Sequence, residues 1–237
     1  MASDPQRPAA PVNRLLARLP EADYRRLLPH LEPVDLAFNL VLYDLRAPIE
    51  HAYFPTGAVG SALAIMADGG TIEVATVGNE GLIGHIAAAG GRTSAHKVVV
   101  QVGGGGLRIG AGALRAEVAR SDPLRALLMD YHTAFLAQVS QSVACNGLHR
   151  LEQRCCRWLL MARDRVGSDD LQLTHEYLAL MLGARRASVT DVLGPLQAGR
   201  LVRSHRGRII ILDRAGLEGR TCECYRTVKD EYDRLLG

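Results

Sequence analysis

The sequence predicts an α+β protein with an N-terminal β-roll or barrel, a long dimerisation helix and a C-terminal winged helix-turn-helix. Between Phe38 and Ile109, short stretches of period-two hydrophobicity alternate with glycines, as in all-β rolls. A long helical segment then opens at Pro123. From Leu173 to Leu212, two helical patterns precede a basic hairpin. We therefore expect domains at 1–122, 123–147 and 148–237.

Composition favours a folded protein of the cytoplasm. The 237 residues are 48% hydrophobic, which is enough to bury substantial cores. No apolar run is long enough to span a bilayer, and residues 1–11 lack the apolar core of an export signal. We expect no membrane partner.

The region before the strands is predicted to be helical. Asn13 to Leu31 carries leucines on one face, and Pro20 should interrupt the helix. Later in the roll, the tract Gly103 to Gly106 is predicted to form a turn, because it lacks the lysine and hydroxyl residue of a phosphate-binding loop.

The long helical segment carries an apolar stripe whose residues step by four, three and four positions. This spacing is typical of a coiled-coil seam, so we predict a homodimer interface. Packing of the same stripe against the chain's own barrel would give an identical period, and this alternative stays open. The stripe comprises Leu124, Leu128, Tyr131 and Phe135.

Two further helices are expected in the C-terminal part. Arg150 to Val166 should form a helix that ends at Gly167, with Trp158 in its buried face. Asp213 to Leu236 is predicted to be a single capped helix.

The segment between these helices has the chemistry of a nucleic-acid reader. Thr174 can cap a first helix, and Gly183 supplies the turn. Arginines and hydroxyls at the start of the second helix suit phosphate oxygens and base edges. The predicted contacts from these helices are Thr174, Arg185, Arg186, Ser188, Thr190 and Asp191. Gly194-Pro195 should bend or end the second helix, with Leu196 still packed inward.

The basic hairpin that follows is predicted to be a wing over the DNA backbone. Between Arg185 and Arg214 lie seven arginines and only two aspartates, Asp191 and Asp213. Such a local excess of positive charge gives salt-dependent affinity without sequence readout. The predicted wing contacts are Arg203, Arg206 and Arg208.

Together these residues resemble the Crp/Fnr superfamily of bacterial transcription regulators, and the likeness covers nearly the whole chain. It implies that Arg186 occupies the position of the guanine-reading arginine. Ala187 replaces a glutamate often used to read cytosine, and Asp191 replaces an arginine, so a different target sequence is implied. The implied partners are double-stranded DNA, a second copy of the chain, RNA polymerase and a small-molecule effector.

The effector is the least determined feature. The segment from Gly81 to Ala95 is similar to the family's cyclic-nucleotide phosphate cassette, which makes Arg92 and Thr93 candidate effector ligands. However, Leu82 stands where the cassette has a glutamate for the ribose hydroxyl, and Glu80 should point elsewhere, which argues against cyclic AMP. Haem stays open, with histidines in or near the sensor region at His30, His51, His85 and His96.

The five cysteines all lie at or after Cys145, which argues against the N-terminal iron–sulfur cluster of one branch of the family. We expect reduced, buried thiols. Cys222 and Cys224 should not bind a metal, because two ligands without a second pair make no site and residues two apart on a helix face different ways.

Two functional classes remain. The first is a sequence-specific DNA-binding regulator, and the alternative is a ligand-sensing or scaffolding module whose helix-turn-helix binds protein. Steep salt dependence would favour the first. No catalytic motif such as G-x-S-x-G or H-E-x-x-H is present, so we expect no enzyme.

Overall fold

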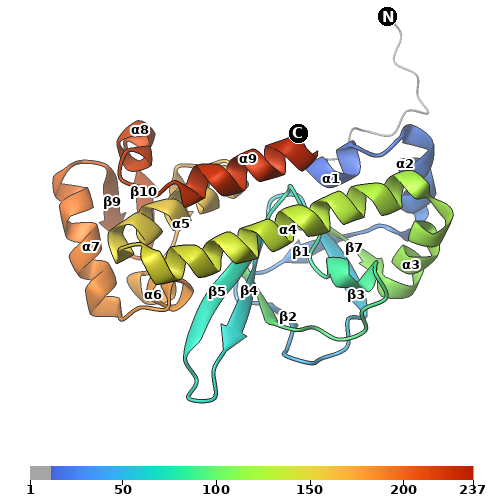
Figure 1. Cartoon of the computed structure of the whole chain (residues 1–237), viewed down its shortest axis with the longest axis horizontal. Coiled ribbons are helices and arrows are strands. Elements are labelled where there is room, and N and C mark those ends of the chain that lie inside the picture. The colour runs from blue at the N-terminus through green and yellow to red at the C-terminus, as the bar shows by residue number, and fades with distance from the viewer. Residues whose placement is uncertain (1–11, 237) are drawn as a thin grey trace, which may run out of the picture.

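The computed structural model describes residues 12–236, and the predicted fold class is confirmed: a β-roll, a long helix and a winged helix-turn-helix follow one another (Figure 1). The expectation that residues 1–11 hold no export signal lies outside the described part. Within residues 12–236, no helix combines the length and hydrophobicity that a bilayer span requires.

The N-terminal roll consists of two antiparallel sheets that enclose a core of fully buried side chains, among them Phe54, Leu82 and Ile109. One sheet has the order β1-β7-β3, and the other has the order β2-β6-β4-β5. Their strands are β1 (Glu32–Leu36), β2 (Val41–Tyr43), β3 (His51–Pro55), β4 (Val59–Ile65), β5 (Thr71–Val77), β6 (Lys97–Val102) and β7 (Gly104–Gly110).

The predicted turn over Gly103 to Gly106 is wrong, because only Gly103 lies between β6 and β7. The other three glycines are strand residues that pair with β1, with Gly106 opposite Val34. A Cβ on Gly104 would lie 2.6 Å from the backbone carbon of Gly57. Glycine in this strand therefore permits the close approach of two backbone segments.

Short helices flank the roll. The predicted interruption at Pro20 is confirmed, since Pro20 is the N-cap of α2. The helix α3 was not predicted as a separate element. These helices are α1 (Arg14–Ala17), α2 (Glu21–Leu27), the 3-10 turns η1 (Leu28–His30) and η2 (His85–Ala87), and α3 (Ala111–Arg120).

The long helix α4 (Asp122–Leu148) begins at the cap Ser121, whose hydroxyl accepts a hydrogen bond from the Leu124 N–H. The prediction that the first apolar stripe forms an exposed dimer seam is wrong. Leu124, Leu128 and Tyr131 are buried within their own chain, and Phe135 is half-buried, with its ring centroid 4.5 Å from that of His85. Tyr131 and Phe135 contact His85 of the roll, so this part of the stripe packs on the chain's own roll, which is the alternative left open above.

A second stripe on α4 is more exposed to solvent than the first. It steps by three and four positions, like the first, but is shifted by one residue along the helix. Met129, Leu136 and Val143 are all more than half exposed, at 57%, 56% and 68%. The stripe comprises Met129, His132, Leu136, Val139 and Val143.

The C-terminal domain contains a three-stranded sheet of order β8-β10-β9 surrounded by helices. The predicted helix before Gly167 is confirmed as α5, and Gly167 ends it with a φ of 70°. The elements are α5 (Leu151–Val166), β8 (Asp170–Gln172), α6 (His175–Leu182), α7 (Arg186–Ala198), β9 (Val202–His205), β10 (Arg208–Ile211), α8 (Arg214–Glu218) and α9 (Cys224–Leu236).

The last segment is two helices rather than the single one predicted. α8 ends at Glu218, and Cys222 lies in the turn before α9, not on a helix. α9 runs along α4 and reaches back to α1 (Figure 1). There the Arg18 guanidinium donates to the Leu236 carbonyl at 2.9 Å. The end of the C-terminal domain is thus joined to the start of the roll.

Buried polar contacts join the roll to α5. The Arg165 guanidinium contacts the Glu80 carboxylate at 2.8 Å and the Gln138 side-chain oxygen at 2.8 Å. The Trp158 indole donates to Glu73 on β5. Burial is the main influence on Glu73, and it raises the pKa of that carboxyl to about 7.

Candidate nucleic-acid interface

The first helix of the motif, α6, is fixed by its cap and by its contact with the roll. Thr174 accepts a hydrogen bond from the Tyr177 N–H at 3.1 Å, as predicted for a cap. Gly183 ends the helix with a φ of 57°, and a Cβ there would lie 2.7 Å from the Ile72 side chain. Glycine at this position therefore serves both the turn and the packing of α6 against β5.

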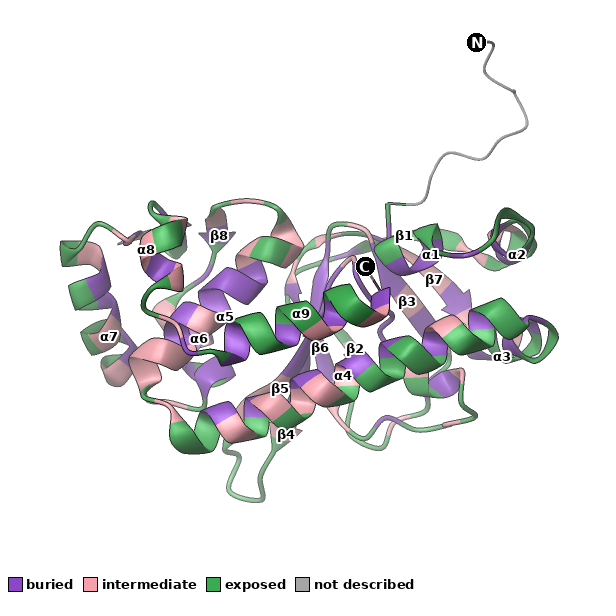
Figure 2. Cartoon of the chain, turned by 45° about the horizontal axis from the view of Figure 1, so that its top comes forward, coloured by how far each residue is buried: buried purple, intermediate pink, exposed green. Residues whose placement is uncertain are grey.

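The second helix, α7, presents its N-terminal arginines to solvent. Arg185 is the N-cap and Arg186 the first helical residue, and both side chains are exposed. Val189, Leu193 and Leu196 are buried, which fixes the helix against the rest of the domain. α7 lies at the end of the molecule farthest from α2 and α3, and exposed residues follow its outer side (Figure 2).

Of the bend or early end expected at Pro195, the early end is wrong, whereas the inward packing of Leu196 is confirmed. The helix continues through Pro195 to Ala198, and Leu196 is 1% exposed. The residue before the proline is Gly194, which has no Cβ with which the proline ring could clash. The carbonyl that loses its donor belongs to the exposed Asp191, where water can replace the N–H.

His175 connects three elements of the motif and was missed in the sequence. Its Nδ1 lies 3.0 Å from the Thr190 hydroxyl on α7, and its Nε2 lies 2.8 Å from the Ser204 hydroxyl on β9. The Thr190 hydroxyl donates to the Arg186 carbonyl, so it accepts from Nδ1–H, and Nε2 accepts from Ser204. Partial burial, together with the charge of Arg186, lowers the pKa of His175, which keeps the ring neutral.

These contacts change the expected role of Thr190. Although exposed, its hydroxyl is already engaged with His175 and with the Arg186 carbonyl. Thr190 therefore positions the start of α7. Ser188 is half-buried, and Asp191 is exposed beside the arginines.

The wing forms as predicted, but its arginines are not equivalent. Arg206 and Gly207 have φ values of 45° and 77° and form the tight turn between β9 and β10. Arg203 and Arg206 are exposed. Arg208 instead forms two hydrogen bonds with the Asp170 carboxylate on β8, which raise the pKa of its guanidinium. A phosphate would have to compete with Asp170 for Arg208.

Comparison with known proteins agrees with this geometry. Residues 153–220 match the Crp-like helix-turn-helix domain. No curated protein matches the chain in sequence. Many solved structures share its fold, among them regulators of the Crp/Fnr family. The chain carries a Crp-like helix-turn-helix domain and has the fold of Crp/Fnr regulators.

Three solved structures illustrate the likeness. A Crp/Fnr-family transcriptional regulator from Eubacterium rectale is 18% identical with a TM-score of 0.63, covering 90% of this chain and 97% of that one. FixK2 from Bradyrhizobium japonicum is 14% identical with a TM-score of 0.70, covering 81% and 98%. A CRP-family regulator from Thermus thermophilus is 19% identical with a TM-score of 0.65, covering 79% and 95%. At these identities the structures show a shared fold.

The roll contains a cavity of about 230 Å³ against α4. Arg92 and Thr93, the predicted effector ligands, are not among its lining residues, and Glu80 points to Arg165. The lining within the described chain includes no arginine, lysine or carboxylate. A cyclic phosphate would find no cation there, so the cavity does not fit a cyclic nucleotide.

The cavity instead groups three imidazoles with aromatic and aliphatic side chains. His85 and His96 line it from the roll, and His132 lines it from α4, whereas His30 and His51 do not. Burial, together with the neighbouring His132, lowers the pKa of His85 to about 4. His85 is therefore neutral at physiological pH, and the cavity suits a small, largely apolar molecule.

Proposed function

We propose that this Crp/Fnr transcription regulator binds palindromic duplex DNA as a homodimer, with the N-terminus of α7 in the major groove. The observation that carries the proposal is the exposure of Arg185 and Arg186 at the start of a helix whose opposite face is buried. An arginine at this position can form a bidentate pair with guanine O6 and N7. We assign base readout to Arg186.

Backbone contacts would come from the groups around α7. Arg185, Ser188 and the exposed wing residues Arg203 and Arg206 suit phosphate oxygens, and Arg208 would contribute after release from Asp170. The Thr174 hydroxyl already accepts the cap hydrogen bond, so it can act as a donor to phosphate.

The dimer would form through the exposed stripe of α4 rather than through the buried one. Met129, Leu136 and Val143 lie seven residues apart on a helix of 27 residues, so the exposed stripe spans about two heptads. Two parallel copies of α4 would place both α7 helices on one side of the dimer. Recognition helices one DNA turn apart are about 34 Å from each other.

A small apolar molecule in the roll cavity is the proposed effector, because the cavity residues His132, Leu136 and Val139 lie on α4 itself. Contact with RNA polymerase stays a prediction of the family resemblance.

The test is selection of genomic fragments by the purified protein, followed by binding titration on the selected site. We expect Arg186→Ala to weaken specific binding by about 10- to 100-fold while leaving binding to random DNA nearly unchanged. Arg115→Ala is the matched control, because Arg115 is an exposed arginine on α3, at the other end of the molecule. Equal selectivity of Arg186→Ala and the parent would refute the assigned base contact.

The alternative, a module that binds protein through its helix-turn-helix, is separated by the salt dependence of the same titration. Contacts with several phosphates predict a steep linear fall of log affinity with log salt concentration. No selected DNA fragment and no salt-dependent binding to duplex DNA would contradict the proposal as a whole.

A further inference from the structure

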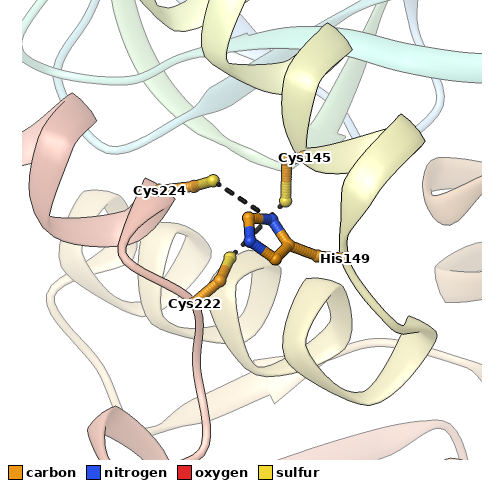
Figure 3. Close-up of side chains that lie close together, drawn as sticks. All are labelled: Cys145, His149, Cys222 and Cys224. Carbon is orange, nitrogen blue, oxygen red and sulfur yellow. Dashed lines mark hydrogen bonds between the residues drawn. The ribbon is translucent and has the colours of Figure 1, made fainter.

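Four potential metal ligands from distant parts of the chain meet beside the C-terminal end of α4 (Figure 3). Cys145 and His149 are four residues apart, and His149 is the C-cap of α4. Cys222 lies in the turn before α9, and Cys224 is the first residue of α9. The three sulfur atoms and one imidazole nitrogen all lie within 4.8 Å of one another.

This arrangement removes both reasons for expecting no metal at Cys222 and Cys224. The two cysteines do not share a helix, so they are free to point the same way. The missing second pair is supplied by Cys145 and His149, which face one side of α4 because they are one helical turn apart. Cys145 and His149 lie at least 73 positions before Cys222 and Cys224 in the sequence.

The spacing of the ligand atoms matches a single tetrahedral ion. Zn²⁺ with bonds of about 2.3 Å to sulfur and about 2.0 Å to nitrogen places its ligand atoms roughly 3.5 to 3.8 Å apart. The Cys145 and Cys222 sulfurs are 3.5 Å apart, and the Cys224 sulfur lies 3.4 Å from His149 Nδ1. One ion at the centre would replace these direct contacts by four bonds of ordinary length.

His149 is held in the tautomer that a metal requires. Its Nε2 lies 3.3 Å from the Glu223 carboxylate, and Glu223 separates the two cysteines in sequence. A proton on Nε2 is therefore satisfied by Glu223, which leaves the Nδ1 lone pair directed at the sulfurs. A carboxylate on the far nitrogen of a metal-binding histidine is the usual outer contact of zinc sites.

The burial of the ligands indicates a closed, structural site. Cys145, Cys222 and Cys224 are 1%, 4% and 0% exposed, and His149 is half-buried. The Gln141 side-chain amide donates to the Cys224 sulfur, a contact that a thiolate strengthens. Arg157 lies close to Cys145, where it would offset the single negative charge of one divalent ion with three thiolates.

We propose that Cys145, His149, Cys222 and Cys224 bind one Zn²⁺ ion. Binding would release the three thiol protons and form three Zn–S bonds and one Zn–N bond. The ion would join the end of α4, which bears the exposed heptad stripe, to the start of α9. It would therefore fix the C-terminal helix on the long helix at the point where the chain enters the DNA-binding domain.

The first test is the metal content of the full-length protein, purified with a thiol reductant and without chelator or added metal. Elemental analysis should find about one zinc per chain. Cys145→Ala and Cys224→Ala should lose it. Cys155→Ala, the matched control, should retain it, because Cys155 is equally buried but outside the cluster. Glu223→Gln, which keeps all four ligands, should weaken zinc affinity by about 10- to 100-fold.

A second test does not depend on how the variants fold. Zinc is removed from the parent by a chelator, and Co²⁺ is titrated in. We expect thiolate-to-cobalt charge-transfer absorption and the visible bands of tetrahedral Co²⁺, saturating at one ion per chain, with displacement by Zn²⁺. The proposal is overturned if the parent contains no zinc and gives no tetrahedral cobalt spectrum. It is also overturned if non-reducing mass spectrometry of protein kept under reductant finds a Cys145–Cys222 disulfide, or if the cluster holds iron.

Discussion

The indole N–H of Trp158 on α5 donates a hydrogen bond to the carboxylate of Glu73 on β5, and the two atoms are 2.9 Å apart. The only tryptophan of the chain thus connects the C-terminal domain to the N-terminal roll. The other carboxylate oxygen of Glu73 accepts from the Ser61 hydroxyl at 2.6 Å. A single side chain therefore links two strands of the roll to the first helix of the DNA-binding domain.

Glu73 makes stability dependent on pH. Its folded pKa of about 7 lies above the ordinary value of 4.5, so between these values the folded state holds a proton that the unfolded state has lost. The free energy of unfolding should therefore fall as the pH rises through this window. The Glu73→Gln variant carries no ionisable group at this position. When the pH is raised from 5 to 8, its free energy of unfolding should increase relative to that of the parent by on the order of 1 kcal/mol. Urea unfolding at both pH values measures the difference, and a constant gap between the two proteins would contradict it.

Gly183→Ala should destabilise the docking of α6. Alanine would occupy a φ of 57° and place its Cβ against Ile72, and we expect a loss of about 1 to 2 kcal/mol. Gly147→Ala in α4 is the control, because a Cβ there meets nothing within 4 Å and should stabilise the helix by about 0.5 to 1 kcal/mol. Thermal unfolding of both variants checks the opposite signs.

Leu136→Glu should convert the proposed homodimer to monomers, because it places a charge in the middle of the exposed stripe. The measurement is sedimentation equilibrium or light scattering at several concentrations. Thr227→Glu adds the same charge on the exposed side of α9 and should leave the dimer intact. A Leu136→Glu protein that is still dimeric would show that another surface holds the two copies together.

Asp170→Asn should strengthen DNA binding by releasing Arg208. The freed guanidinium adds one phosphate contact, so the slope of log affinity against log salt concentration should steepen by about 1. Asp169→Asn removes an equal charge one residue earlier, where the partner is Arg163, and should leave the slope unchanged. Identical slopes for the two variants would show that Arg208 does not reach the backbone.

Features that depend on local sequence were predictable. The cap at Thr174, the turn glycine Gly183 and the end of α5 at Gly167 are each specified by one residue and its near neighbours. The order of helix, turn, helix and wing was therefore recognised without coordinates. The residues that would touch DNA follow from that order, and His175 could have been suspected as the first residue of α6.

Features that depend on which face meets which neighbour were not predictable. Both stripes of α4 have coiled-coil spacing, but only the one from Leu124 to Phe135 was considered as a dimer seam, and it is largely buried within its own chain. Similarly, Pro195 was expected to bend or end α7, because the lost backbone donor was given more weight than the inward packing of Leu196, yet the helix continues to Ala198. The cluster around Cys145 and Cys222 needed the path of α9 along α4, which no spacing in the sequence reveals.

The roll cavity and the exposed stripe share residues of α4. His132, Leu136 and Val139 line the cavity and also belong to the exposed stripe. In a pair of chains joined along that stripe, any molecule large enough to displace these side chains would press on the neighbouring copy as well. Binding of a molecule in one cavity would then be coupled to the distance between the two α7 helices of the pair.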